Sequence, residues 1–126
     1  MRTVALALSA AVVCGCDVFP CGDTLLARYP SPDGKVEAVV WQRDCGATTS
    51  YSVIVEIDRV RRRPELKIGR DVIVLGAVGT SLGGRVVWTS DRSAEVRTVL
   101  PLREPTPRAT DVRIKGRDIS VRIVQT

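Results

Sequence analysis

Hydrophobic and polar residues alternate along most of the chain, from Leu25 to the C-terminus. Such period-two alternation is typical of strands that turn one face toward a hydrophobic core. The clearest example is the segment Tyr51–Asp58. Its inward positions are predicted to be Tyr51, Val53, Val55 and Ile57, and its water-facing positions Ser52, Glu56 and Asp58.

Eight segments carry strand patterns and are separated by turn residues. They are Leu25–Tyr29, Lys35–Asp44, Tyr51–Asp58, Asp71–Val78, Arg85–Thr89, Ala94–Leu100, Asp111–Lys115 and Asp118–Val124. The second is apolar on both faces, which predicts a central strand. The last two should form a hairpin around Gly116, and the one candidate helix is short, at Pro64–Ile68. We therefore expect an all-β domain, a single small antiparallel sandwich or a curved meander of about seven or eight strands.

The first 16 residues follow a different pattern. Arg2 precedes an apolar run, Val4–Val13, that is interrupted only by Ser9. This run is too short for a membrane-spanning helix, which needs roughly 20 residues, but it has the size of the hydrophobic region of a secretory signal. The alternative is a buried first element of the domain, with Cys16 as an ordinary core thiol.

The sequence Val13-Cys14-Gly15-Cys16 resembles the lipobox of bacterial lipoproteins. Val13 and Gly15 match the positions three and one before the modified cysteine, and Cys14 departs from the usual choice between them. The resemblance implies that residues 1–15 are a lipoprotein signal peptide and that Cys16 is lipidated. Residues 16–26 are then the lipidated N-terminus and tether, and 27–126 the β domain. The expected location is the periplasmic face of an envelope membrane, inner or outer, with the membrane contacted through the N-terminal lipid.

The cysteine count follows from this division. If Cys14 is removed with the signal and Cys16 is acylated, Cys21 and Cys45 remain in an oxidising compartment, where two thiols usually pair. Such a bridge would stabilise the domain by about 3 kcal/mol. A metal site or a redox pair would be the alternative. The chain has no histidine, no nearby third thiol and no C-x-x-C motif to support either.

The composition of the chain excludes several classes of enzyme and metal site. The chain has 126 residues, of which 44% are hydrophobic and 26% charged, and none is histidine. Without histidine the commonest general acid/base, the usual Ser and Cys nucleophile systems and imidazole zinc sites are excluded. We expect no catalytic residues, no metal and no cofactor. A histidine-free hydrolase is the less favoured alternative, and its candidate carboxylates are Asp44, Glu56, Asp58, Asp91 and Glu95.

Two further motifs are distinctive, the turn Ser31–Lys35 (SPDGK) and the segment Arg43–Ser50 (RDCGATTS). With the lipobox, they are similar to those of a family of small, uncharacterised bacterial lipoproteins, over about Ser31–Val55. The resemblance implies export, a β fold and a disulfide, and no particular activity. The loop at Cys45 is either a disulfide-locked structural loop or a small polar binding loop. In the second case its candidate contacts are Arg43, Asp44, Thr48 and Thr49.

The charge is positive, with 19 Lys+Arg against 14 Asp+Glu and a net charge of +5. Part of the excess is a basic run made by Arg59, Arg61, Arg62 and Arg63. An exported protein with few aromatic residues for stacking is not expected to bind nucleic acid. Anionic lipid headgroups or envelope polymers are better partners. The candidate membrane-surface contacts are Arg61, Arg62 and Arg63, and the alternative is an ordinary solvated loop.

Together these patterns predict a non-catalytic, lipid-anchored protein of the cell envelope with a binding or accessory role. Its partner would be an unknown envelope protein or polymer. A structural lipoprotein that rests a basic loop on the membrane is the alternative. The sequence makes no prediction of the oligomeric state.

Overall fold

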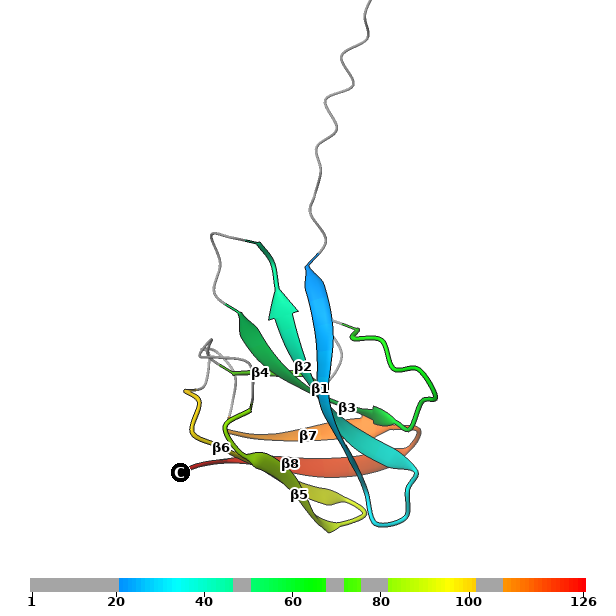
Figure 1. The fold of residues 1–126 in the computed structure, drawn as a ribbon. Coiled ribbons are helices and arrows are strands. Elements are labelled where there is room, and N and C mark those ends of the chain that lie inside the picture. Colours follow the sequence, from blue (N-terminus) through cyan, green and yellow to red (C-terminus); the bar gives the residue numbers. More distant parts are fainter. Residues whose placement is uncertain (1–20, 47–50, 68–71, 76–81, 102–107) are drawn as a thin grey trace, which may run out of the picture.

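The structure is a computed structural model that describes residues 21–46, 51–67, 72–75, 82–101 and 108–126. Its strands form two four-stranded sheets, with the orders β1-β2-β3-β4 and β5-β6-β8-β7 (Figure 1). The strands are β1 Gly22–Pro30, β2 Val36–Asp44, β3 Ser52–Arg59, β4 Val72–Leu75, β5 Arg85–Ser90, β6 Ser93–Thr98, β7 Ala109–Ile114 and β8 Arg117–Gln125.

The predicted all-β sandwich is confirmed, with one difference in strand direction. Five of the six neighbouring pairs are antiparallel, as expected for hairpins. The sixth pair, β6 with β8, is parallel, because β7 takes the edge position beyond β8 instead of the place next to β6. The predicted hairpin around Gly116 is present as β7 and β8.

Two predictions are corrected, the start of the β domain and the short helix. The segment 22–26, expected to be part of a tether, belongs to β1, because Gly22 and Asp23 pair with Asp44 and Arg43 of β2. The helix expected at Pro64–Ile68 is not formed over its described part, 64–67, which has no regular structure. This segment lies across the outer face of the first sheet, and its tertiary contacts decide its conformation.

The core lies between the sheets and is built from alternate residues of both. The first sheet contributes Val36, Ala38, Val40, Val53, Val55 and Ile57, and the second Val86, Ala94, Val96, Val112, Ile119, Val121 and Ile123. Tyr51, which the alternation places in this core, lies before the first residue of β3 and is 45% exposed. Trp88 of β5 joins the two sheets, since its indole N–H donates to the carbonyl oxygen of Tyr29 at 2.7 Å.

A second, smaller core covers the outer face of the first sheet. Val39, Trp41 and Ile54 are buried there, with Leu66 of the segment 60–67 packed against them. β2 is therefore buried on both faces and central, as predicted. Glu56, predicted to face water, is instead only 2% exposed, because it lies on this covered face. No helix among the described residues is long and apolar enough to cross a membrane.

Candidate functional site

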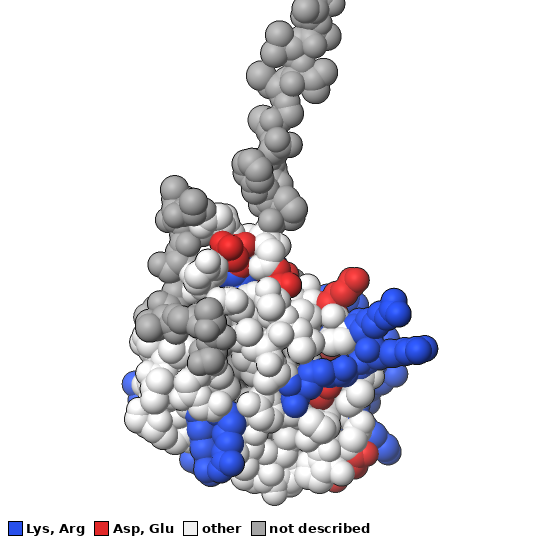
Figure 2. Space-filling view, in the orientation of Figure 1, with Lys and Arg blue, Asp and Glu red and all other residues white. Residues whose placement is uncertain are grey.

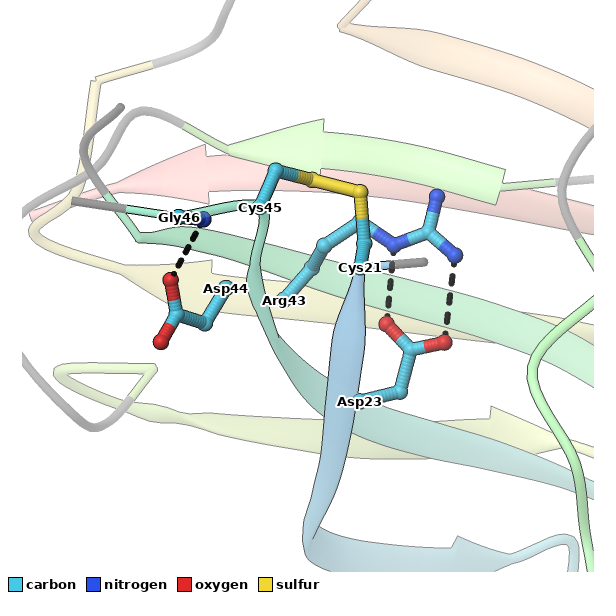
Figure 3. Close-up of a disulfide and its surroundings, with 6 residues drawn as sticks. All are labelled: Cys21, Asp23, Arg43, Asp44, Cys45 and Gly46. Carbon is cyan, nitrogen blue, oxygen red and sulfur yellow. Dashed lines mark hydrogen bonds and ion pairs between the residues drawn. A yellow bond between two sulfur atoms is a disulfide. The ribbon is translucent and has the colours of Figure 1, made fainter. Parts of the chain in front are cut away.

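One end of the first sheet is closed by a disulfide. Cys21 and Cys45 are joined with a Cα–Cα distance of 4.1 Å, one position beyond the paired residues Gly22 and Asp44 (Figure 3). Beside it the Arg43 guanidinium donates to both carboxylate oxygens of Asp23, at 2.8 and 3.1 Å. This pairing raises the pKa of Arg43. The start of β1, an edge strand, is thus bound covalently and by charge to the central strand β2.

The predicted binding loop is, over its described part, engaged in local structure. Arg43 is bound by Asp23, and the Asp44 carboxylate accepts a hydrogen bond from the Gly46 N–H at 3.0 Å. Such a bond from a side chain to the backbone two residues on is typical of a turn. Thr48 and Thr49 lie outside the described residues, as does the proposed lipidation site Cys16.

Two buried carboxylates lie on the covered outer face of the first sheet. Glu56 accepts from the Trp41 indole N–H at 3.3 Å, from the Lys67 backbone N–H at 3.2 Å, and from the Arg61 guanidinium. Glu37, also 2% exposed, is bound by Arg28 through two N–H groups, at 2.7 and 2.9 Å. Each buried acid therefore has an arginine partner, which a carboxylate removed from water needs.

Arg61 fixes the covering segment 60–67 to the sheet. Its guanidinium pairs with Glu56, lies 3.5 Å from Asp58 and donates to the Glu65 carbonyl oxygen at 2.8 Å. The Arg61 carbonyl oxygen accepts in turn from Arg28, at 2.6 Å. With 13% of its side chain exposed, Arg61 has a structural role, in contrast to the exposed position expected of a membrane contact.

The two following arginines remain available, because Arg62 and Arg63 are both exposed. The sequence grouped them with Arg61 because three consecutive arginines look alike. The structure separates them by exposure, because Arg61 is half-buried and bound to Glu56, while Arg62 and Arg63 are exposed. Figure 2 shows basic side chains projecting together on the side of the molecule where this segment lies.

Four exposed basic residues, with the half-buried Arg61, meet around one hollow at the end of the first sheet opposite the disulfide. Lys35 precedes β2, Arg59 ends β3, Arg62 follows in the covering segment, and Lys115 lies in the turn between β7 and β8. The hollow has a volume of about 670 Å³ and is also lined by Gly34, Val60 and Arg61. We name it the basic hollow. A backbone bond from the Val60 N–H to the Lys35 carbonyl oxygen, 3.1 Å long, holds two of its walls together.

Asp33, in the turn beside this hollow, is already paired with a basic residue. Asp33 is bound by Arg117 of β8 at 2.7 Å, and its backbone N–H donates to the Asp91 carboxylate at 2.9 Å. The bond from Arg117, together with one from the Ser31 hydroxyl, holds the pKa of Asp33 well below its ordinary value. The three turns that carry Asp33, Asp91 and Arg117 are thereby tied to each other across the two sheets.

The carboxylates considered for a hydrolase do not converge within the described residues. Asp44 lies beside the disulfide, Asp91 is in the turn between β5 and β6, and Glu95 is in β6. Only Glu56 and Asp58 are neighbours, and Arg61 is bound between them. The described part of the chain also brings together no group of His, Cys, Asp and Glu residues that could hold a metal ion.

Sequence reasoning missed two members of the basic hollow, Lys35 and Lys115. The turn residues around each were recognised, so their place at a turn was predictable. Which turns of the two sheets lie together depends on the strand order and on the parallel pair of β6 and β8, for which the sequence carries no local signal. No protein-family model matches the chain, and no curated protein or solved structure matches it significantly.

Proposed function

We propose that this protein is a lipid-anchored protein of the bacterial cell envelope that acts by binding and not by catalysis. The observation that carries the proposal is the Cys21–Cys45 disulfide at the point where the domain begins. Structural disulfides persist in oxidising compartments and are rare in the cytosol. The bridge thus agrees with the export signal that residues 1–16 resemble, and both imply the same compartment.

The position of the bridge also suits an anchor at Cys16. Five peptide units separate Cys16 from Cys21, so the domain would begin within about 18 Å of the lipid. Any load on the anchor would enter the domain at the first residue of β1, an edge strand that has one neighbour in its sheet. The disulfide transfers that load to β2, the central strand, so that β1 is not peeled away.

Catalysis is not part of the proposal, because the buried and half-buried carboxylates of the outer face are already bound. Arginine partners are bound to the three carboxylates on the covered outer face of the first sheet, Glu37, Glu56 and Asp58. A general acid or base must instead have an atom within hydrogen-bond reach of the substrate.

The lipid anchor is tested by replacing each N-terminal cysteine in turn. The chain is expressed in a Gram-negative host that is fed an alkyne analogue of palmitate, and the purified protein is examined for label. We expect Cys16→Ser to remove the label and to release the protein from the membrane fraction or leave it unprocessed. The matched control is Cys14→Ser, which should be labelled like the unchanged chain. Full labelling of the Cys16→Ser variant would contradict the proposal.

A further inference from the structure

The basic hollow has the charge of an anion-binding surface. Besides Arg61, which is paired with Glu56 and Asp58, its lining has four cations, Lys35, Arg59, Arg62 and Lys115, which come from three separate segments and from both sheets. Within the described ranges, none of the four forms an ion pair with an acidic residue. The carboxylates of Asp33 and Asp58, in the segments nearby, are paired with other arginines. The positive charge of the hollow is therefore not neutralised from within the described part of the fold.

Lys115 adds an independent observation from the backbone. Its φ angle is +48°, and that of the next residue, Gly116, is +78°. Two successive positive φ angles in a two-residue hairpin turn are those of a type I′ turn, where Asn-Gly is the favoured pair. A lysine in the left-handed region is strained, and such strain is retained mainly at functional positions. Lys115 is also the residue that brings a charge from the second sheet to the basic hollow.

The shape of the surface indicates what kind of anion fits. The basic hollow is open to solvent and has no aromatic side chain in its lining, so it offers no stacking platform for a base or a neutral sugar ring. A second hollow of about 480 Å³ shares Arg59, Arg61 and Lys115 with it and continues to Lys67 and Arg113, and its lining also includes the carboxylates Glu56 and Asp58, which are paired with Arg61. We name the two adjoining hollows the basic track, and together they have room for more than one small anion.

We propose that this track binds an extended acidic polysaccharide, recognised through regularly repeated negative charges. Several cations spread along an open track attract a flexible polyanion at many points. Each contact is weak in water and screened by salt, so affinity comes from their number. Carboxylates on successive sugar units supply such a series of charges, and the fit does not depend on an enclosed pocket.

The position of the track favours a polymer over the headgroups of the anchoring membrane, an argument that rests on the proposed function. Lys35 and Arg59 lie at the end of β2 and β3 opposite Cys21 and Cys45. Eight residue steps along β2 separate the two ends, or about 27 Å. With Cys16 in the membrane, the disulfide end is held near the lipid and the basic track is presented away from it.

The test uses the full chain purified from membranes in a neutral detergent. Binding of fluorescein-labelled polygalacturonate is followed by fluorescence anisotropy at about 0.1 M salt, where the Debye length is about 10 Å. We compare Arg59→Gln/Lys115→Asn with a control of equal charge, Arg108→Gln/Arg122→Gln, whose residues lie at the other end of the β7–β8 hairpin. If each charge contributes about fivefold, the first variant should bind about 25-fold more weakly and the control within twofold.

Single replacement of Lys115 separates function from folding. Lys115→Asn should bind the polymer about fivefold more weakly, and it should unfold at a higher urea concentration because asparagine suits the turn better. A loss of affinity in a more stable protein cannot be a folding defect. Neutral dextran should not bind to any of these proteins.

Three results would overturn the proposal. The first is equal weakening in the Arg59/Lys115 and Arg108/Arg122 variants, which would show binding by net charge alone. The second is the absence of polygalacturonate binding by the unchanged chain. The third is binding only to phosphatidylglycerol vesicles, lost in the Arg59/Lys115 variant, which would assign the track to a membrane surface. Because the Cys16→Ser protein keeps the track, its affinity for the polymer should be unchanged whether or not Cys16 is the lipid anchor.

Discussion

The two ends of the first sheet are held together in different ways. Where the described chain begins, a disulfide and an Arg43–Asp23 pair join β1 to β2. At the other end, the turn around Asp33 is held by Arg117 of the second sheet, and unpaired cations surround the basic hollow. The first end is closed within one sheet, and the second is assembled from both sheets.

This difference agrees with a division of labour between the ends. A covalent bond keeps its strength under load and in any salt, which suits the end that would bear an anchor. Charge pairs between turns are screened and reversible, but they bring side chains from both sheets to one surface. The covering segment 60–67 belongs to this second end, since it supplies Arg62 and is fixed by Arg61.

The largest effect is expected where the second end is fixed to the sheet. Arg61→Met leaves the Glu56 carboxylate buried without its charged partner, which costs about 3–5 kcal/mol of the free energy of unfolding. The adjacent change Arg62→Met removes an exposed charge and should alter that free energy by at most about 0.5 kcal/mol. Urea unfolding of the two variants measures the contrast between neighbouring arginines.

Rescue of the Arg61 variant tests the reason for its instability. In the double variant Glu56→Gln/Arg61→Met, the buried charge is gone, and the single amide oxygen can still accept one of the two N–H bonds, from Trp41 or from the Lys67 backbone. A large part of the lost stability should return. A single variant as stable as the Arg62 control would show that Glu56 and Arg61 are not the pair that holds the covering segment.

The first end should be weakened by a smaller amount when its disulfide is removed. Cys21→Ser/Cys45→Ser releases a loop closed by residues 24 positions apart and should lower the free energy of unfolding by about 3 kcal/mol. The affinity for polygalacturonate should not change in conditions where the variant is folded. Unchanged stability, or a loss of affinity equal to that of the Arg59/Lys115 variant, would contradict the separation of the two ends.

The smallest effect concerns the Asp33–Arg117 pair and depends on pH. Because Arg117 lowers the pKa of Asp33 in the folded protein, the carboxylate stabilises the fold fully above about pH 5. That contribution declines below the ordinary pKa of 3.8, as the unfolded chain takes up the proton first, and is lost when the folded carboxyl is protonated. The difference in urea midpoint between the unchanged chain and Asp33→Asn should therefore be constant near neutral pH and shrink in acid. A difference that grows as the pH falls would have the wrong sign.

The strands could be predicted because each leaves a local signal, an alternation ended by turn residues. The same signal is wrong for Glu56, whose position faces outward but is covered by a segment with no regular structure of its own. Burial of Glu56 depends on Leu66 and Arg61, which belong to the covering segment 60–67 and contact residues of β2 and β3. Alternation identifies the two faces of a strand and does not reveal what covers the outer one.

The candidate site also has one part that could be predicted from the sequence and one part that could not. The pairing of Cys21 with Cys45 followed from the number of cysteines and the compartment, and the structure contains it. The basic run was visible in the sequence, but Arg61 within it is bound to Glu56 of the sheet, and Lys115 lies 53 positions beyond Arg62 in the chain. Their meeting is a consequence of strand order in two sheets, which no single segment encodes.

The division between the ends is tested most directly by hydrogen exchange of the lipid-anchored chain in neutral nanodiscs, with and without polygalacturonate. The account predicts slower exchange in segments 34–36, 58–63 and 113–117, and no change in 21–25 and 43–46. Protection confined to 21–25 and 43–46, or no protection under conditions where the polymer is bound, would contradict it.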